Sequence, residues 1–249
     1  MRPKLLALLA LLLLPIAGAQ AARSHSLYQF AYLPGTDVYQ WGAMDAIPHQ
    51  VTGAPADADW SRWSMLHDHD AYRLYVYRKG SSSLYQFAFD GQAYAWGYHS
   101  IPEITIAGLP ADADTSHFAM LWDGADYRFY VRRAGVSSLY QAAWVAGTDR
   151  YQYAYHSIAE IPIAGFPTDT DWSGWSMLHD GTSYRLYAMR SDSRLVLYQG
   201  AFDAGSSRYV YGHDSIPRLT VVGTPQAASH KDFAMLFGEG VYRLYLMGK

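Results

Sequence analysis

The chain contains no cysteine in 249 residues, so disulfide bonds, thiolate metal sites and a lipid-modified cysteine are excluded. Charged residues are scarce as well, at 16% of the chain, whereas 50% is hydrophobic and 16% is aromatic. Without disulfides, a chain of this size must be stabilised by a hydrophobic core. So many aromatic side chains are typical of strands and of interfaces between packed sheets.

The chain has no long apolar run, and its one short apolar run lies near the start. It extends from Leu5 to Leu14, whereas a membrane-spanning helix needs about 20 apolar residues. Basic residues precede this run and the small-residue sequence Ala19-Gln20-Ala21 follows it. The pattern predicts a signal peptide over residues 1–21 and one mature domain over residues 22–249. We therefore expect a secreted or periplasmic protein with no membrane span after cleavage.

Positive charge is in short supply too. Removing Arg2 and Lys4 with the signal peptide leaves 17 basic residues against 22 acidic ones, a formal charge of −5. Binding to nucleic acid needs a basic face, so we expect no nucleic-acid partner. The chain also lacks Ser-His-Asp, HExxH and glycine-rich phosphate motifs, and we expect a protein that is not an enzyme.

The chain contains one sequence pattern that is repeated four times. A Tyr-Arg-x-Tyr motif recurs in steps of 55, 57 and 58 residues, with its arginine at Arg73, Arg128, Arg185 and Arg243. Within a repeat, short apolar runs alternate with period two between glycine-containing turns, as at 118–122, 127–131, 139–144 and 151–155. This pattern predicts four antiparallel strands per repeat.

The two ends of the chain hold complementary parts of one repeat. The mature chain begins with a third and a fourth strand (27–32 and 38–41) and ends with a first and a second strand (233–237 and 242–246). Pairing these parts closes a ring and hides the sheet edges, whereas a solenoid would need caps. We therefore predict an all-β fold, a four-bladed β-propeller of four repeats of about 56 residues, closed by its terminal strands.

The hairpin predicted between second and third strands places Arg73 opposite Gln86, and it places the other three arginines opposite equivalent glutamines. We interpret Arg73, Arg128, Arg185 and Arg243 as a structural ring, because the same residue in every repeat is what a scaffold requires. An anion site is the alternative. Small residues at Ser64 and its equivalents fit the crowding of first strands around an axis.

The segments before the first strands resemble a known repeat. Gly108-Leu109-Pro110, followed by Phe118 and then Tyr127-Arg128, resembles the hemopexin-type repeat. The likeness covers all four copies loosely, although these copies are longer and the cysteine pair of that family is missing. The resemblance implies a four-bladed disc outside the cell, which binds proteins or other ligands and has a central tunnel able to hold Ca²⁺ or another ion. We expect no other cofactor. The resemblance assigns no functional residue in this chain.

Three linkers carry an Asp-x-Asp pair, at Asp57 and Asp59, Asp112 and Asp114, and Asp169 and Asp171. Hard carboxylates in a loop can bind Ca²⁺, so Asp57, Asp112 and Asp169 are candidate metal ligands. Alternatively, these side chains accept hydrogen bonds from nearby backbone amides and shape the entry into each first strand. The fourth repeat has Ala227 and Ser229 instead, which excludes four-fold ion binding by this set.

Two tryptophans in alternate repeats are candidate ligand platforms. Trp60 and Trp172 can stack on a sugar ring while Asp59 and Asp171 accept its hydroxyl groups. The alternative is that each indole packs against the adjacent blade. We predict a binding module for an extracellular glycan or protein on the face that carries the linkers. A glycan-active hydrolase or lyase, which needs paired carboxylates near the axis, and a structural envelope-associated protein remain alternatives.

Overall fold

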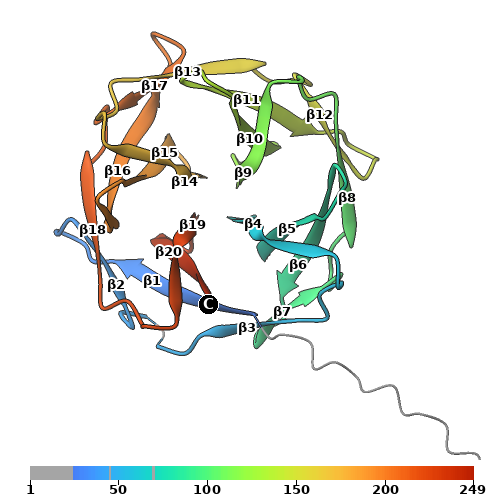
Figure 1. The fold of residues 1–249 in the computed structure, drawn as a ribbon, viewed down its shortest axis with the longest axis horizontal. Helices are drawn as coiled ribbons and strands as arrows, with labels where there is room; N and C mark the ends of the chain where they lie inside the picture. The colour runs from blue at the N-terminus through green and yellow to red at the C-terminus, as the bar shows by residue number, and fades with distance from the viewer. Residues whose placement is uncertain (1–24, 45, 69–70) are drawn as a thin grey trace, which may run out of the picture.

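The computed structural model describes residues 25–44, 46–68 and 71–249, which contain twenty strands. These residues include no helix, and hence none long and apolar enough to span a membrane. The predicted signal peptide, residues 1–21, lies outside them. The strands are arranged in a ring around a central axis, so the predicted all-β, propeller-like fold is confirmed (Figure 1).

The sheet consists of four antiparallel units, each with three long strands that follow one another outward from the axis (Figure 1). The first strands are β4 (Ala58–His67), β9 (Ala113–Trp122), β14 (Thr170–His179) and β19 (Ala228–Gly238). The second strands are β5 (Tyr72–Arg78), β10 (Tyr127–Arg133), β15 (Tyr184–Arg190) and β20 (Val241–Gly248). The third strands are β6 (Ser83–Phe89), β11 (Ser138–Trp144), β16 (Ser193–Asp203) and β1 (His25–Tyr32).

Two short strands complete each unit and share the outer edge of its third strand. The fourth strands are β7 (Ala93–Trp96), β12 (Arg150–Tyr153), β17 (Arg208–Tyr211) and β2 (Val38–Trp41). The fifth strands are β8 (Glu103–Ala107), β13 (Glu160–Ala164), β18 (Arg218–Val222) and β3 (His49–Thr52). We call β4–β8 unit 1, β9–β13 unit 2, β14–β18 unit 3, and β19, β20 and β1–β3 unit 4.

The fifth strand is a correction to the four strands per repeat that the pattern predicted. In β8, Ile104 and Ile106 are buried and Thr105 between them is exposed, which is the period-two pattern of a short strand. β8 also runs parallel to β12 of the next unit, with Ile106 opposite Tyr151. Because β13–β17, β18–β2 and β3–β7 pair in the same way, all twenty strands belong to one sheet.

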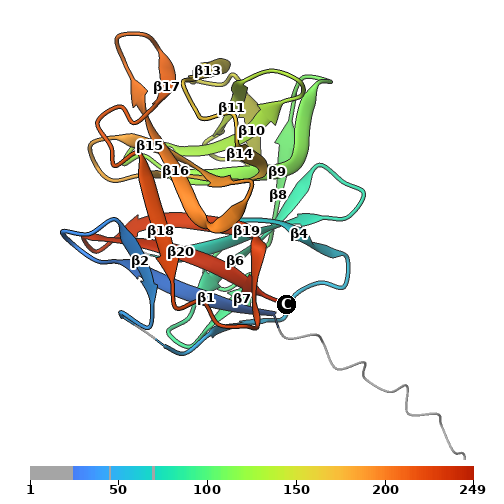
Figure 2. The ribbon, with the colours of Figure 1, turned by 60° about the vertical axis from the view of Figure 1, so that its left-hand side comes forward.

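The terminal strands close the ring as expected. β1 lies antiparallel to β20, with Leu27 opposite Met247 and Gln29 opposite Tyr245, and the two strands are side by side in Figures 1 and 2. The pairing within the hairpins differs from the prediction, because Gln86 faces Tyr75 while Arg73 faces Ala88. A shift of two residues keeps every side chain on the same face, so the alternating pattern cannot distinguish the two registers.

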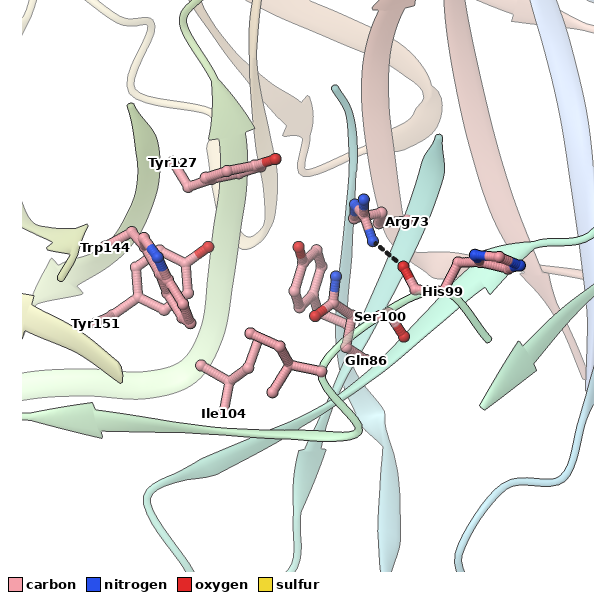
Figure 3. A pocket seen from close by; sticks show the side chains of 10 residues that line it. Arg73, Gln86, His99, Ser100, Ile104, Tyr127, Trp144 and Tyr151 are labelled. Carbon is pink, nitrogen blue, oxygen red and sulfur yellow. Dashed lines mark hydrogen bonds between the residues drawn. The ribbon is translucent and has the colours of Figure 1, made fainter. Parts of the chain in front are cut away.

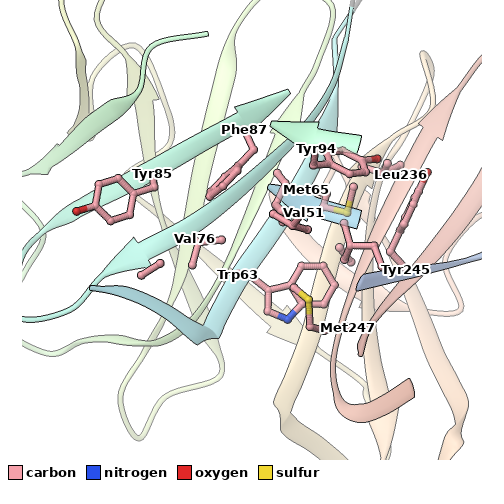
Figure 4. Packing of buried hydrophobic residues seen from close by; sticks show 14 residues of the cluster. Val51, Trp63, Met65, Val76, Tyr85, Phe87, Tyr94, Leu236, Tyr245 and Met247 are labelled. Carbon is pink, nitrogen blue, oxygen red and sulfur yellow. The ribbon is translucent and has the colours of Figure 1, made fainter. Parts of the chain in front are cut away.

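Hydrophobic cores lie between neighbouring units. Figure 4 shows one of them, where Trp63 and Val76 of unit 1 share a cluster with Leu236 and Met247 of unit 4. At the axis the small residue Ser64 is buried, and its Oγ accepts a hydrogen bond from the Met120 amide of the next unit at 3.0 Å. The equivalent residues Ala119, Ser176 and Ala234 are buried too. Close approach of the first strands therefore explains the small side chains at this position.

Candidate ligand-binding pockets

Three equivalent pockets lie between neighbouring units, with volumes of about 350, 420 and 320 Å³. One unit contributes the arginine of the Tyr-Arg motif, a tyrosine two residues later, a glutamine and a serine. The next unit contributes the first tyrosine of its second strand, an aromatic residue near the end of its third strand and a tyrosine of its fourth strand. Figure 3 shows this arrangement, with Arg73, Gln86 and Ser100 across from Tyr127, Trp144 and Tyr151.

The other two pockets repeat these residues almost position by position. Between units 2 and 3 they include Arg128, Tyr130, Gln141, Ser157, Tyr184, Phe202 and Tyr209. Between units 3 and 4 they include Arg185, Tyr187, Gln199, Ser215, Tyr242, Tyr32 and Tyr39. The corresponding place between units 4 and 1 would involve residue 45, which lies outside the described residues.

The arginines of the predicted structural ring each border one of these junctions, and Arg128 shows how they are held. Its Nε donates to Asp123 at 2.9 Å, Nη1 to the carbonyl oxygen of His156 at 2.9 Å, and Nη2 to Asp126 at 2.8 Å. Arg73 and Arg185 donate in the same way to Asp68 and Asp180. Arg243 instead donates to the Gly238 carbonyl and to Glu239.

Glutamine is therefore a second partner of the arginine rather than the main one. Oriented with its oxygen toward the guanidinium, Gln86 accepts a hydrogen bond from Arg73 Nη1 at 3.1 Å, and its nitrogen donates to the Ile101 carbonyl. The main partners, Asp68, Asp123 and Asp180, were missed in the sequence. A visible signal exists, because each aspartate stands three residues after the repeated methionine of its first strand, whereas the fourth repeat has Gly238 there.

The same aspartates link neighbouring units. Tyr184 of unit 3 donates to Asp123 of unit 2 at 2.9 Å, and Tyr127 and Tyr242 make the equivalent bonds to Asp68 and Asp180. Burial alone would raise the pKa of Asp123, but hydrogen bonds from the Asp126 amide and from Arg128 outweigh it and lower that pKa. The pKa of Asp180 is lowered likewise, because the bonds from Arg185 and Tyr242 exceed the effect of burial.

These lowered pKa values predict a loss of stability in acid. Because the folded-state values lie below the ordinary 3.8, the stabilisation is present above that pH and disappears as pH falls through the folded-state values. We expect the melting temperature to be nearly constant above pH about 5 and to fall steeply below pH about 4. In thermal melts, the melting temperature of the D123N/D180N variant should fall less with decreasing pH than that of the wild type. An equal fall in the two proteins would contradict this prediction.

Because each arginine is paired with a carboxylate, the pockets carry no strong net charge. Their floors present tyrosine hydroxyls, such as those of Tyr75 and Tyr151, which hydrogen bond across the junction between units. Burial raises the pKa of both hydroxyls well above their ordinary value of 10.0, so both stay protonated. The pairs Tyr130 with Tyr209 and Tyr187 with Tyr39 repeat this contact. A neutral ligand with donors and acceptors suits such a lining better than an anion.

Each pocket also borders a serine with a buried hydroxyl group, which follows a residue of positive φ. The hydroxyl groups of Ser100, Ser157 and Ser215 are buried, and none has a hydrogen-bond partner within the described part of the chain. The residue before each serine, His99, His156 or Asp214, has a positive φ of 42°, 43° or 40°. Such a backbone is strained for residues other than glycine, and here it turns the carbonyl oxygen toward the pocket arginine. In the fourth repeat, Ala46 replaces the serine.

The predicted metal ligands lie at the opposite end of the second strands. The Lys79 amide at the end of β5 donates to the Asp57 carbonyl, whereas the pocket residue Arg73 lies at the start of β5. The Asp57 carboxylate accepts from Arg78 at 2.9 Å and from Tyr85 at 2.7 Å. Asp112 has the same partners in Arg133 and Tyr140, and Asp169 accepts from Tyr198.

A calcium ion at Asp57 or Asp112 would have to displace a guanidinium group. Across the described ranges, no group of three or more His, Cys, Asp or Glu side chains is placed to hold a metal ion. Near the axis, a cavity of about 10 Å³, with room for about one water molecule, lies between residues such as Met120, Met177 and Met235. Its described lining also contains no carboxylate, which is what the predicted hydrolase alternative would need.

The two predicted platforms have different surroundings. Trp60 is half-buried, and the His25 ring stacks on its indole at 4.0 Å with an interplanar angle of 22°. Trp172 is half-buried as well, but it lies against Phe166 and beneath the guanidinium of Arg132. Asp59 accepts from Ser61 and Arg62, and Asp171 accepts from the Ser173 amide. The two aspartates therefore shape the bulge in their own strands.

No protein-family model matches the chain, and no curated protein matches it. The chain is similar to the lectin of Aleuria aurantia, described as a six-bladed β-propeller that recognises fucose, with 18% identity and a TM-score of 0.31 over 71% of this chain and 50% of the lectin. It is also similar to a Dyadobacter fermentans protein of unknown function, with 12% identity and a TM-score of 0.34 over 82% of this chain and 55% of that protein. A third similar structure is the Malassezia sympodialis allergen Mala s 1, with 10% identity and a TM-score of 0.30 over 74% of this chain and 54% of the allergen. The chain spans about half the length of each. Likeness this weak carries no conclusion about the number of blades or the ligand.

Proposed function

We propose that the protein is a secreted four-bladed β-propeller that binds neutral glycans in the pockets between its blades. Each of the four units is one blade in this proposal, and the single domain over residues 22–249 follows the predicted signal peptide. In this proposal the architecture resembles the hemopexin-type disc, and ligands larger than an ion bind between the blades because the cavity near the axis has room for only about one water molecule.

The observation that carries the proposal is the repetition of an unfilled pocket. Residues that repeat only to hold a scaffold should fill their space and satisfy their hydrogen bonds. Here a space of 320 to 420 Å³ remains at three junctions, which is within the usual size of small-molecule sites. Each space borders a buried serine hydroxyl without a protein partner. A ligand hydroxyl would supply that partner after a small shift of the strained loop.

The composition of the lining favours a sugar over other small ligands. Trp144, Phe202 and Tyr32 give each pocket one aromatic wall, on which the C–H face of a pyranose can pack. Arginine, glutamine and tyrosine supply donors and acceptors to hydroxyl groups. A hydrolase would need two carboxylates, and of the described residues that line these pockets only Asp214 is acidic. A glycan-binding role is therefore better supported than catalysis.

A titration tests the proposal. The mature chain should bind a neutral glycan selected on a glycan array, with a stoichiometry of about three per chain, one for each described pocket. Replacing Ser100, Ser157 and Ser215 together by alanine should weaken binding about tenfold, the value of one hydrogen bond per site. The melting temperature should not fall, because alanine already occupies position 46 and the lost hydroxyls have no protein partner.

Trp144→Ala provides the matched control, because it alters the wall of one pocket only. The number of sites should drop from three to two while the remaining affinity is unchanged. Absence of binding to every neutral glycan on the array would contradict the proposal and favour the structural envelope-associated alternative. Binding that persists unaltered in both variants would place the ligand elsewhere on the protein.

A further inference from the structure

A further cavity lies between units 2 and 3, at the end of the strands that carries the linkers. It has a volume of about 260 Å³ and is lined by two aromatic rings, Phe166 and Trp172, and by the hydroxyl groups of Ser137, Thr168 and Thr170. Ser137 and Thr168 are exposed, and Thr170 donates its hydroxyl hydrogen to the Pro167 carbonyl. The cavity therefore joins a flat apolar wall to a row of hydroxyl groups.

The indole of Trp172 is fixed in position by its neighbours. The guanidinium of Arg132 lies 4.8 Å from the ring centroid, which is cation–π distance. Phe166 packs against the indole at 5.1 Å with an angle of 56°. A ring held in this way loses little conformational entropy when a ligand stacks on it.

The equivalent place in unit 1 holds an aromatic ring of the chain itself. His25 opposes Val51 at the start of β1, and Ser137 holds the same position relative to Ile163 in unit 2. Beside Trp60 this position supplies the His25 imidazole, which stacks on the indole at 4.0 Å. Beside Trp172 it supplies only the small side chain of Ser137, and the space remains open. The chain therefore places the His25 imidazole on the Trp60 indole and the Arg132 guanidinium on the Trp172 indole, and a cavity of about 260 Å³ remains beside Trp172.

We infer that the cavity beside Trp172 is a second ligand site, which takes one neutral pyranose ring of a glycan chain. The sugar ring packs against the Trp172 and Phe166 rings that line the cavity. Its hydroxyl groups bond to Ser137, Thr168 and Thr170. The site shares its ligand class with the proposed function but none of its residues with the three pockets between blades.

The test exchanges the two residues that distinguish the sites. Protein with ¹⁵N-labelled indole groups is titrated by NMR with maltotriose, cellotriose, mannotriose and chitotriose. We expect at least one of these probes to shift the indole signal of Trp172 and not that of Trp60. Ser137→His should weaken this response about tenfold or more, because a stacking imidazole then fills the cavity. His25→Ser should create a response at Trp60.

Further variants keep this test separate from that of the pockets. Thr168→Ala should weaken the Trp172 response without lowering the melting temperature, since Thr168 is exposed. Trp144→Ala should leave the Trp172 response unchanged, so loss of the pockets and loss of this site are distinguishable. The inference is overturned if no probe shifts the Trp172 signal, if Ser137→His leaves the response intact, or if only free imidazole shifts it.

Discussion

Deleting residues 22–42 is expected to abolish cooperative unfolding and to produce aggregation. The deletion removes β1 and β2, which leaves β20 as an open edge strand and takes Leu27, Phe30 and Tyr39 out of two hydrophobic cores. The loss of so many buried contacts exceeds the typical total stability of a domain, about 5–15 kcal/mol. Circular dichroism melts and size-exclusion chromatography measure the result.

A permuted chain is the control for this deletion. Moving residues 22–42 behind Lys249 through a short linker lets β20 continue into β1 as a hairpin, as β5 continues into β6 in unit 1. The permuted protein should melt cooperatively. A truncated chain that stays monomeric and melts like the wild type would show that the terminal strands do not close the ring.

Arg128→Met is expected to destabilise the protein by about 3 kcal/mol, the usual cost of breaking a buried ion pair on one side. The Asp123 side chain is only 3% exposed, so the substitution leaves a buried carboxylate without its guanidinium partner. This expectation differs from a loss of the Gln141 contact alone, which the sequence suggested. Urea unfolding monitored by tryptophan fluorescence gives the free energy directly.

Arg133→Met in the same strand is the matched control. Its partners Asp112 and Glu160 are 44% and 34% exposed, and so its ion pairs should contribute about 1 kcal/mol or less. Equal losses in the two variants would contradict the view that the buried aspartates hold the ring of arginines. The double variant D123L/R128M should recover part of the loss, because it removes both buried charges.

The repeat pattern was sufficient to predict four of the five strands of each unit, the ring and its closure, because each depends on residues that recur along the chain. The register of the hairpins could not be predicted, since pairing Gln86 with Arg73 or with Tyr75 satisfies the same alternation. The pockets were missed for a different reason. They are formed by residues such as Arg73 and Trp144, which lie in different units and show no joint signal in the sequence.

The difference between Trp60 and Trp172 illustrates the same limit. Both follow an aspartate in equivalent positions, so the sequence treated them as a pair. Their surroundings differ at His25 and Ser137, which lie at the start of the third strand of the preceding unit and directly before it, respectively. Contacts between units therefore decide which of two matching residues borders an open site.

Repeated pockets around one ring have a functional consequence. A ligand displayed in many copies on a surface would engage several pockets of one molecule. Once the first copy is bound, the next copy is held near its pocket at a high effective concentration, so the overall affinity exceeds that of a single pocket. Monovalent sugars should accordingly bind much more weakly than the same sugars displayed on an array.

The most direct test of the account is a crystal structure of the mature protein with the glycan that binds best on the array. The account predicts sugar density in the pockets beside Arg73, Arg128 and Arg185, with a ligand hydroxyl bonded to Ser100, Ser157 or Ser215 and a ring face on Trp144, Phe202 or Tyr32. Sugar bound at the axis, or pockets that remain empty while the ligand occupies another surface, would contradict it.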